Sequence, residues 1–277
     1  MLEFKYKEWK VNILSNARYK VAVIASGSSG NCVYVENGGV KVLIDAGITS
    51  KRIEAGLQSI GVSPHDIDAI FITHEHIDHV NGLRVFQKKY HKKLFLSKGT
   101  FEGLKEKDAI RENCEIKLIP QYSEFLINDC VINTFLTDHD ANEPFGVSMS
   151  SGGIKISLAT DLGYVNKAVF SHLERSNILI FEANYDEEML INGIYPWHLK
   201  KRIMGKKGHL SNRDSAAALL ALNWEGLSHI YLAHLSRENN THETARNAVM
   251  EAFVKESHTP VFLSTWHDRP GECVSRG

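Results

Sequence analysis

Four side chains that can bind metal ions lie within HEHIDH, the six residues that begin at His74. This segment follows an apolar run at residues 69–73, which predicts a buried strand. In extended backbone His74 and His76 point to the same side of the chain, and a turn can then bring Asp78 and His79 alongside them. Imidazole and carboxylate groups suit zinc, manganese and iron. We predict a metal site here rather than a solvated polar turn, because such groups seldom crowd a strand end without partners.

Three further candidate ligands occur singly, and each follows a different apolar run. They are His139 after residues 131–136, Asp161 after residues 154–159, and His234 after residues 229–233. A lone histidine in such a place is more often a hydrogen-bonded structural residue. Two metal ions need more ligands than the first cluster offers, however, and we expect those ligands at strand ends. The ordered set is therefore interpreted as completing a dinuclear site.

Short apolar runs alternate with helical patterns along the chain, and these elements must position the ligands. Strands are predicted at residues 19–25, 32–36, 40–45, 69–73, 93–97, 115–119, 125–127, 131–136, 146–150, 154–159, 177–182 and 229–233, and the one at 229–233 is the last clear strand before the helix that begins at residue 241. Helices are predicted at residues 51–60, 81–90, 211–224 and 241–255. Hairpins and helices in both halves predict an α+β fold with two sheets packed face to face and helices outside. Because no linker divides the chain, we expect a single domain over residues 1–277, with residues 1–20 an extension of unknown role.

Composition limits the class of protein. Of the 277 residues, 43% are hydrophobic and 23% are charged, as in ordinary globular proteins. No apolar run approaches the roughly 18 residues that span a bilayer, and the N-terminus lacks the apolar core of a signal peptide. We therefore expect a cytoplasmic protein without a membrane partner. The four cysteines are scattered without a CxxC pair, which favours reduced thiols over a zinc–cysteine site or disulfides.

The formal net charge of −1 lacks the basic excess that marks many nucleic-acid binders, but it allows local basic patches. Two stretches could be such patches. They are Lys200, Lys201, Arg202, Lys206 and Lys207, which precede His209, and Lys88, Lys89, Lys92 and Lys93. Each could guide a phosphate backbone, although a solvated helix face is the commoner outcome for clustered lysines.

The HxHxDH pattern that begins at His74 resembles the signature of metallo-β-lactamase-fold hydrolases. The resemblance implies an αββα sandwich, with two mixed β-sheets flanked by helices, that holds two divalent metal ions. It assigns the ligands His74, His76 and His139 to one ion and Asp78, His79 and His234 to the other, with Asp161 bridging both. It also implies that Asp45, after residues 40–44, supports the histidine loop without binding metal. Ligands without cysteine are compatible with Zn²⁺ or Mn²⁺.

Motifs at residues 26–31, 43–47, 159–165 and 208–212 narrow the resemblance to the YycJ/WalJ group, described as nucleases or phosphodiesterases with a proposed 5′-to-3′ DNA exonuclease activity. The last third of the chain also resembles tRNase Z. There His209 resembles a catalytic histidine that contacts phosphate or assists the leaving group, and Glu182 resembles the carboxylate that aligns it. The plainer alternatives are a helix-entry residue for His209 and a loop cap for Glu182.

These resemblances imply a dinuclear-metal phosphodiesterase or nuclease that uses a metal-bridging hydroxide, with Asp78, His209 and Glu182 as catalytic residues. Nucleic acid is the expected substrate, with DNA favoured over RNA. One alternative is a metallo-hydrolase of lactones, thioesters or β-lactams, and another is a non-catalytic binding module, which predicts lost ligands. Two further classes are disfavoured. Diiron redox relatives have Glu at the position of His76, and a β-CASP ribonuclease needs a longer segment between Asp161 and His209 to hold its inserted domain. Metal identity, exonuclease against endonuclease action, oligomeric state and the role of Trp266-His267 stay open.

Overall fold

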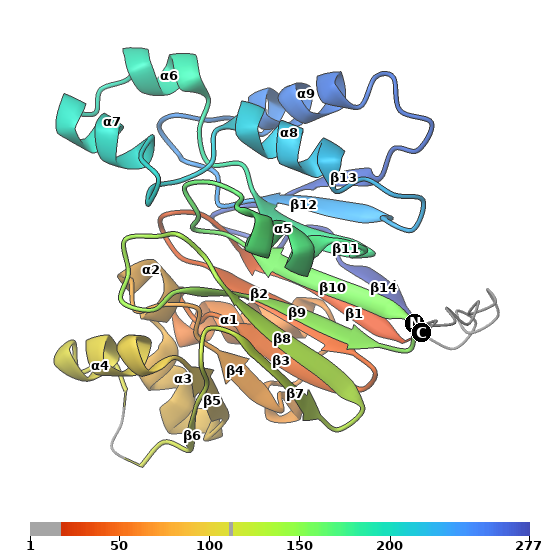
Figure 1. The fold of residues 1–277 in the computed structure, drawn as a ribbon. Helices are drawn as coiled ribbons and strands as arrows, with labels where there is room; N and C mark the ends of the chain where they lie inside the picture. The colour runs from red at the N-terminus through yellow and green to blue at the C-terminus, as the bar shows by residue number, and fades with distance from the viewer. Residues whose placement is uncertain (1–17, 111–112) are drawn as a thin grey trace, which may run out of the picture.

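Two seven-stranded sheets face each other in the computed structural model, which describes residues 18–110 and 113–277 (Figure 1). The first has the order β14-β1-β2-β3-β4-β5-β6, and the second has the order β13-β12-β11-β10-β9-β8-β7. The strands of the first sheet are β1 (Tyr19–Ala25), β2 (Cys32–Asn37), β3 (Val40–Ile44), β4 (Ala69–Phe71), β5 (Lys93–Leu96), β6 (Ile116–Leu118) and β14 (Val274–Arg276). Those of the second are β7 (Ser123–Ile127), β8 (Cys130–Leu136), β9 (Phe145–Ser151), β10 (Ile154–Ala159), β11 (Ile178–Glu182), β12 (His229–Ala233) and β13 (Val261–Ser264).

Helices cover the outer face of each sheet (Figure 1). Those on the first sheet are α1 (Ser50–Ser59), α2 (Ile77–Val80), α3 (Leu83–Tyr90) and α4 (Lys98–Glu106). Those beside the second are α5 (Lys167–Leu173), α6 (Glu187–Asn192), α7 (Trp197–Ile203), α8 (Asn212–Ala221) and α9 (His242–Ala252). One apolar core lies between the sheets, a second lies between the first sheet and its helices, and a third lies between the second sheet and its helices. The predicted α+β sandwich of two mixed sheets is thus confirmed.

The two sheets share one pattern of strand directions. Strands β3 to β6 and strands β10 to β13 are parallel, while the other neighbours are antiparallel. In β11, Ile178 and Ile180 lie in the core between the sheets, whereas Leu179 and Phe181 pack towards the helices. A strand buried on both faces reads as an unbroken apolar run, which is why the sequence reveals it. Ligand sites in such sheets form beyond the carboxyl ends of the parallel strands.

Helix positions were predicted better than helix ends. The helix expected at residues 81–90 is α3, which begins later, at Leu83, and the short α2 that ends at Val80 was not predicted; Gly82 stands between them. A Cβ added to Gly82 would lie 1.9 Å from the carbonyl oxygen of Ile48, so the chain passes too closely there for a side chain. The helices expected from Ser211 and Thr241 are α8 and α9. Each of these residues caps its helix by accepting a backbone N–H, from Asp214 and Thr244 respectively.

Several short elements were missed. Residues 229–233 form the last strand before the helix at residue 241, as predicted, but no strand was predicted after that helix, where β13 and β14 lie. These strands have four and three residues, too few to show a period, and both include exposed positions. Helices α6 and α7 have six and seven residues, so neither reaches two full turns of apolar periodicity. Among the described residues, no helix is long and apolar enough to cross a bilayer.

Candidate metal centre

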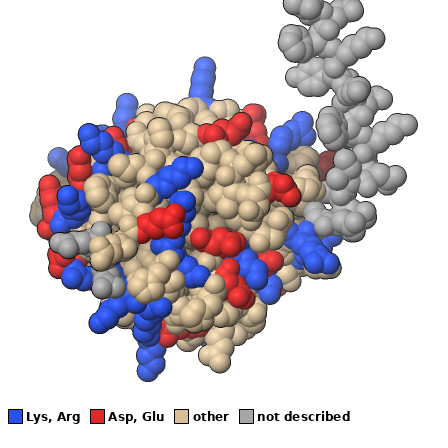
Figure 2. All heavy atoms as spheres, turned by 90° about the horizontal axis from the view of Figure 1, so that it is seen from below, with Lys and Arg blue, Asp and Glu red and all other residues tan. Residues whose placement is uncertain are grey.

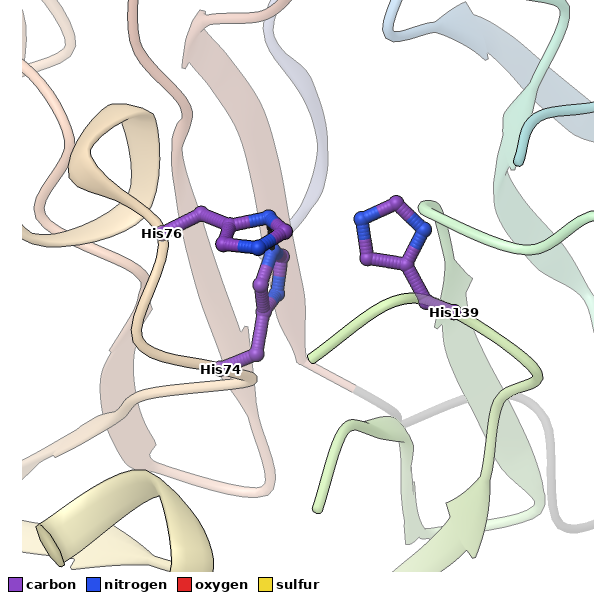
Figure 3. Close-up of side chains that lie close together, drawn as sticks. All are labelled: His74, His76 and His139. Atoms are coloured by element: carbon purple, nitrogen blue, oxygen red, sulfur yellow. Dashed lines mark hydrogen bonds between the residues drawn. The ribbon is translucent and has the colours of Figure 1, made fainter. Parts of the chain in front are cut away.

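The seven predicted ligands converge where the carboxyl ends of the strands of both sheets meet. Potential ligand atoms lie within 4.8 Å of one another in four overlapping groups. The groups are His74, His76 and His139; Asp78, His79 and His234; His74, His79 and Asp161; and Asp161, Glu182, His209 and His234. In Figure 3 the rings of His74 and His76 approach from one side, and His139, from the loop after β8, faces them. The structure therefore brings together each of the two groups of three residues that the resemblance implies. Asp161 lies in the other two groups, which share His74, His79 and His234 with these.

Asp161 lies at the centre of the cluster. Its Oδ2 is 3.4 Å from Nε2 of His79, and its Oδ1 is 3.4 Å from Nε2 of His234 and 3.8 Å from Nε2 of His139. Asp161, Asp45 and His234 each follow a strand with a positive φ, of 58°, 62° and 56°. This left-handed backbone is uncommon outside glycine and costs of order 1 kcal/mol per residue, and it persists where surrounding contacts fix it.

Asp45 holds the imidazole of His79 directly and that of His74 through Thr73, in each case at Nδ1. Its Oδ2 accepts a hydrogen bond of 2.7 Å from Nδ1 of His79. Its carboxylate also accepts from the backbone N–H and the hydroxyl of Thr73, whose oxygen lies 3.1 Å from Nδ1 of His74. A histidine fixed through Nδ1 presents Nε2 to a metal ion. Asp45 thus has the supporting position that the resemblance implies.

His139 and His234 are held in the same way by the second sheet and its loops. Nδ1 of His139 lies 3.2 Å from the carbonyl oxygen of Gly208, and Nδ1 of His234 lies 3.0 Å from Oε1 of Glu182. The same Oε1 accepts a hydrogen bond of 2.8 Å from Nδ1 of His209. The other oxygen of Glu182 accepts the backbone N–H groups of Leu162 and Leu210. Glu182 is fully buried, so these four donors compensate for the loss of water around its charge.

Two asparagines join the site that the sequence did not single out. Nδ2 of Asn31 lies 3.3 Å from Oδ2 of Asp78 and 3.1 Å from Nε2 of His79. Its Oδ1 accepts the backbone N–H of Gly27, which fixes the direction of the amide. Asn184 donates to the carbonyl oxygen of His234 at 2.7 Å. The sequence signal that could have found them is closeness along the chain to motifs already noted. Asn31 ends the loop at residues 26–31, and Asn184 follows Glu182 by two positions.

Charge in the cluster is balanced within a buried space. Burial disfavours a charged imidazole, but Asp161, Asp78 and Glu182 outweigh that effect and raise the pKa of His234 to about 10. Burial acts likewise on His79, and the carboxylates of Asp45, Asp161 and Asp78 raise its pKa well above the usual value. Burial would raise the pKa of Asp161, but the surrounding histidines hold it well below its usual range. The carboxylates are therefore ionised and attract cations.

Two buried atoms test whether a metal ion fits this donor set. Within the described parts of the chain, Oδ2 of Asp161 and Nε2 of His234 have no hydrogen-bond partner, and the 3.4 Å contact from His79 to that oxygen lacks hydrogen-bond geometry. Buried polar atoms without partners are rare. Carboxylate oxygens and imidazole nitrogens that converge in this way fit divalent metal ions, which take up ligand lone pairs in place of protons.

Several side chains of the two basic stretches are hydrogen-bonded or paired within the protein. Lys200 is buried and donates to the carbonyl oxygens of Ile191 and Gly193, so it is not available to a phosphate backbone. Arg202 donates to Asp140 at 2.6 Å, beside His139, and thereby ties α7 to the cluster. In the other stretch, the contacts are Lys89 with Glu54, Lys93 with Glu115, and Lys92 with the carbonyl oxygen of His65. Figure 2 shows basic and acidic side chains interspersed on the face that it displays.

Comparison with known proteins supports the same family. The model of the β-lactamase superfamily domain matches residues 41–234, the span from β3 to His234, the last predicted ligand. Exodeoxyribonuclease YycJ of Bacillus anthracis is 35% identical over 238 residues, which cover 83% of this chain and 87% of that protein. Exodeoxyribonuclease WalJ of Streptococcus pneumoniae is 36% identical over 234 residues, which cover 84% and 87%.

Solved structures share the fold at low sequence identity. The metallo-β-lactamase fold protein YhfI from Bacillus subtilis has a TM-score of 0.70 and 16% identity, covering 94% of this chain and all of that one (100%). A diphosphatase of the PhnP family has a TM-score of 0.65 and 18% identity, covering 94% and 97%. The short form of human tRNase Z has a TM-score of 0.58 and 17% identity, covering 79% and 93%. The chain is therefore a metal-dependent hydrolase that belongs to the β-lactamase superfamily and, within it, to the YycJ/WalJ family.

Proposed function

We propose that this hydrolase cleaves the phosphodiester bonds of nucleic acid, with DNA preferred over RNA, in the manner of an exonuclease. The observation that carries the proposal is the position of His209 at the mouth of the ligand cluster. Its Nδ1 is held by Glu182 at 2.8 Å and lies 3.9 Å from Oδ1 of Asp161. The side chain is nevertheless 19% exposed to solvent. Nε2, on the opposite side of the ring, is left to meet a phosphate oxygen.

The ligand assignment is also a proposal. His74, His76 and His139 would hold one divalent ion, and Asp78, His79 and His234 the other, with Asp161 shared; Zn²⁺ and Mn²⁺ both suit these donors. Bound ions of this kind supply a nucleophile at neutral pH by lowering the pKa of water, and they stabilise charge on phosphate oxygens. The other contributions to the reaction come from side chains of the protein.

Three residues would act on the substrate or position those that do. His209 donates a proton to the leaving oxygen or stabilises its developing charge. Glu182 is a positioning residue, because it fixes the ring of His209 from a fully buried place. Asp78 is partly exposed, with 19% of its side chain accessible, and orients the attacking water. The names of the YycJ and WalJ relatives, both exodeoxyribonucleases, support DNA as the substrate.

Cleavage of end-labelled single- and double-stranded DNA and RNA, with zinc or manganese added, tests the proposal. We expect metal-dependent cutting by the wild type and none by Asp161→Ala, and the ladder of products gives the polarity. Full activity in Asp161→Ala with normal metal content would exclude the assigned role of Asp161. A metal-loaded wild type that leaves nucleic acid intact but hydrolyses a lactone, thioester or cephalosporin would replace the nuclease proposal with the carbonyl alternative.

A further inference from the structure

A groove opens beside the metal centre, and nothing in the proposed reaction uses it. It lies between the segment at residues 235–242, which follows β12, and the loop at residues 266–268, which follows β13. Its volume is about 380 Å³, within the usual range for small-ligand sites. Leu235 lines the groove and directly follows the predicted ligand His234, so the groove begins where the cluster ends.

The wall formed by Trp266 and His267 is fixed by the loop that carries Asn31. The carbonyl oxygen of Trp266 accepts the backbone N–H of Ser26 at 3.0 Å, and the hydroxyl of Ser26 accepts the backbone N–H of His234 at 2.7 Å. A Cβ added to Gly27 would lie 2.2 Å from the ring of His267, so the two segments are in close contact. The wall and the metal ligand therefore share one support.

The opposite wall is held to the first by aromatic and polar contacts. Nε2 of His242 lies 2.6 Å from the carbonyl oxygen of Thr265, and its ring stacks on Trp266 with centroids 4.0 Å apart. The carbonyl oxygen of His267 accepts from Arg52 at 2.7 Å. These contacts form the groove before any ligand binds, which limits the entropy lost on binding.

Arg237 gives the groove an anion contact. Its side chain is exposed, and one guanidinium nitrogen donates to Oγ of Ser29 at 3.1 Å. In the described chain its other N–H groups have no partner, and no carboxylate pairs with it. A planar guanidinium matches phosphate oxygens well. The lining includes one carboxylate, Asp268, and two imidazoles, of His242 and His267.

We propose that this groove binds the phosphate of the nucleotide next to the scissile phosphodiester, with Arg237 as its contact. The inference rests on the proposed nuclease function and assigns it a substrate-strand subsite. Arg237 is three residues from His234 and contacts Ser29 in the loop whose Asn31 donates to Asp78, so we place the phosphate next to a scissile phosphate bound at the cluster in this groove. Such a contact favours polymeric nucleic acid over a diester with a single phosphate.

The test compares two substrates of the metal-loaded enzyme: a single-stranded DNA oligonucleotide and bis(4-nitrophenyl) phosphate, which has one phosphate only. For Arg237→Ala we expect KM for the oligonucleotide to rise about tenfold, and the ratio of kcat/KM for DNA to that for the small diester to fall about tenfold. The slope of log KM against log salt should decrease by about 0.7, as for one lost single-strand phosphate contact. Arg237→Lys should keep that slope. Arg276→Ala, an exposed arginine paired with Tyr19 at the end of β1 remote from Ser26, is the matched control and should change neither quantity.

An oligonucleotide with one neutral methylphosphonate identifies the contacted phosphate. When the methylphosphonate is placed next to the scissile bond, on one side or the other, kcat/KM of the wild type should fall about tenfold. In Arg237→Ala the same change should lower kcat/KM no further. The subsite assignment is overturned if Arg237→Ala behaves like Arg276→Ala. It is also overturned if the effects of Arg237→Ala and of the methylphosphonate add together at both positions.

If the wild type cuts no nucleic acid, the nuclease proposal fails separately. Oligonucleotide binding to the metal-loaded protein, measured by fluorescence anisotropy, then decides the groove: equal affinity in Arg237→Ala and Arg276→Ala excludes it, and weaker binding only in Arg237→Ala sustains it as a phosphate site.

Discussion

Oε1 of Glu182 lies 3.0 Å from Nδ1 of the predicted ligand His234, and the same oxygen lies 2.8 Å from Nδ1 of His209. One buried carboxylate therefore connects metal binding to the proposed proton donor. A change at Glu182 should disturb both, whereas a change at His209 should disturb only the reaction. Substitutions at the two residues therefore separate these effects.

Glu182→Gln should lower metal affinity about 10- to 100-fold and kcat about 100-fold or more. A glutamine amide keeps the shape but cannot accept from two imidazoles and from the N–H groups of Leu162 and Leu210 together. Metal content measured by mass spectrometry and steady-state kinetics check this. Glu251→Gln, at an exposed position on α9, is the control. Normal metal affinity in Glu182→Gln would contradict the shared role.

His209→Ala should retain its metal ions but lose about 10²- to 10⁴-fold in kcat on DNA, because the leaving alkoxide is then not protonated. The loss should be much smaller on bis(4-nitrophenyl) phosphate, whose leaving group is weakly basic and needs no proton. Kinetics on both substrates with metal analysis check this. An equal loss on the two substrates would exclude proton donation and leave charge stabilisation.

Asp45→Ala should destabilise the metal-free protein by about 3 kcal/mol. The carboxylate is buried and accepts from His79 and Thr73, and its removal leaves those donors buried without a partner. Urea unfolding in the presence of a chelator measures the change. Asp45→Asn, which keeps one carbonyl acceptor, should lose less, and equal losses would show that the charge of Asp45 makes no separate contribution.

The stability of the metal-free protein should fall as pH rises from about 6.5 towards 10. The pKa of His234 is raised to about 10, because Asp161, Asp78 and Glu182 outweigh burial, and the unfolded side chain titrates near ~6.5. A raised pKa in the folded state adds stability that is complete below the unfolded value and is lost as pH approaches the folded value. His79 contributes in the same direction.

Metal ions displace these protons, so the metal-loaded protein should lack the decline, and metal affinity should rise over the same pH range. Thermal unfolding from pH 6.5 to 10, with a chelator and with zinc, measures both. Equal pH slopes in the two forms would argue against protonated His79 and His234 in the metal-free site.

The sequence by itself determined where the chemistry lies. Strands buried on both faces appear as apolar runs, and the residues that end those runs, such as His74, Asp161 and His234, stand out because charged and imidazole groups are unexpected there. The starts of the helices at Ser211 and Thr241 were also local enough to predict. Short elements such as β13 lack a period, so the sequence did not reveal them.

Only the tertiary structure decided what these residues contact. Glu182 meets His234 across 52 positions, and Arg237 meets Ser29 across 208. The burial of Lys200 and the groove between the segments after β12 and β13 likewise depend on packing between distant segments. Such contacts follow from the strand order and from the left-handed backbone at Asp45, Asp161 and His234, and no local sequence pattern encodes either. The type of a side chain fixes the chemistry that is available, whereas packing fixes which groups meet.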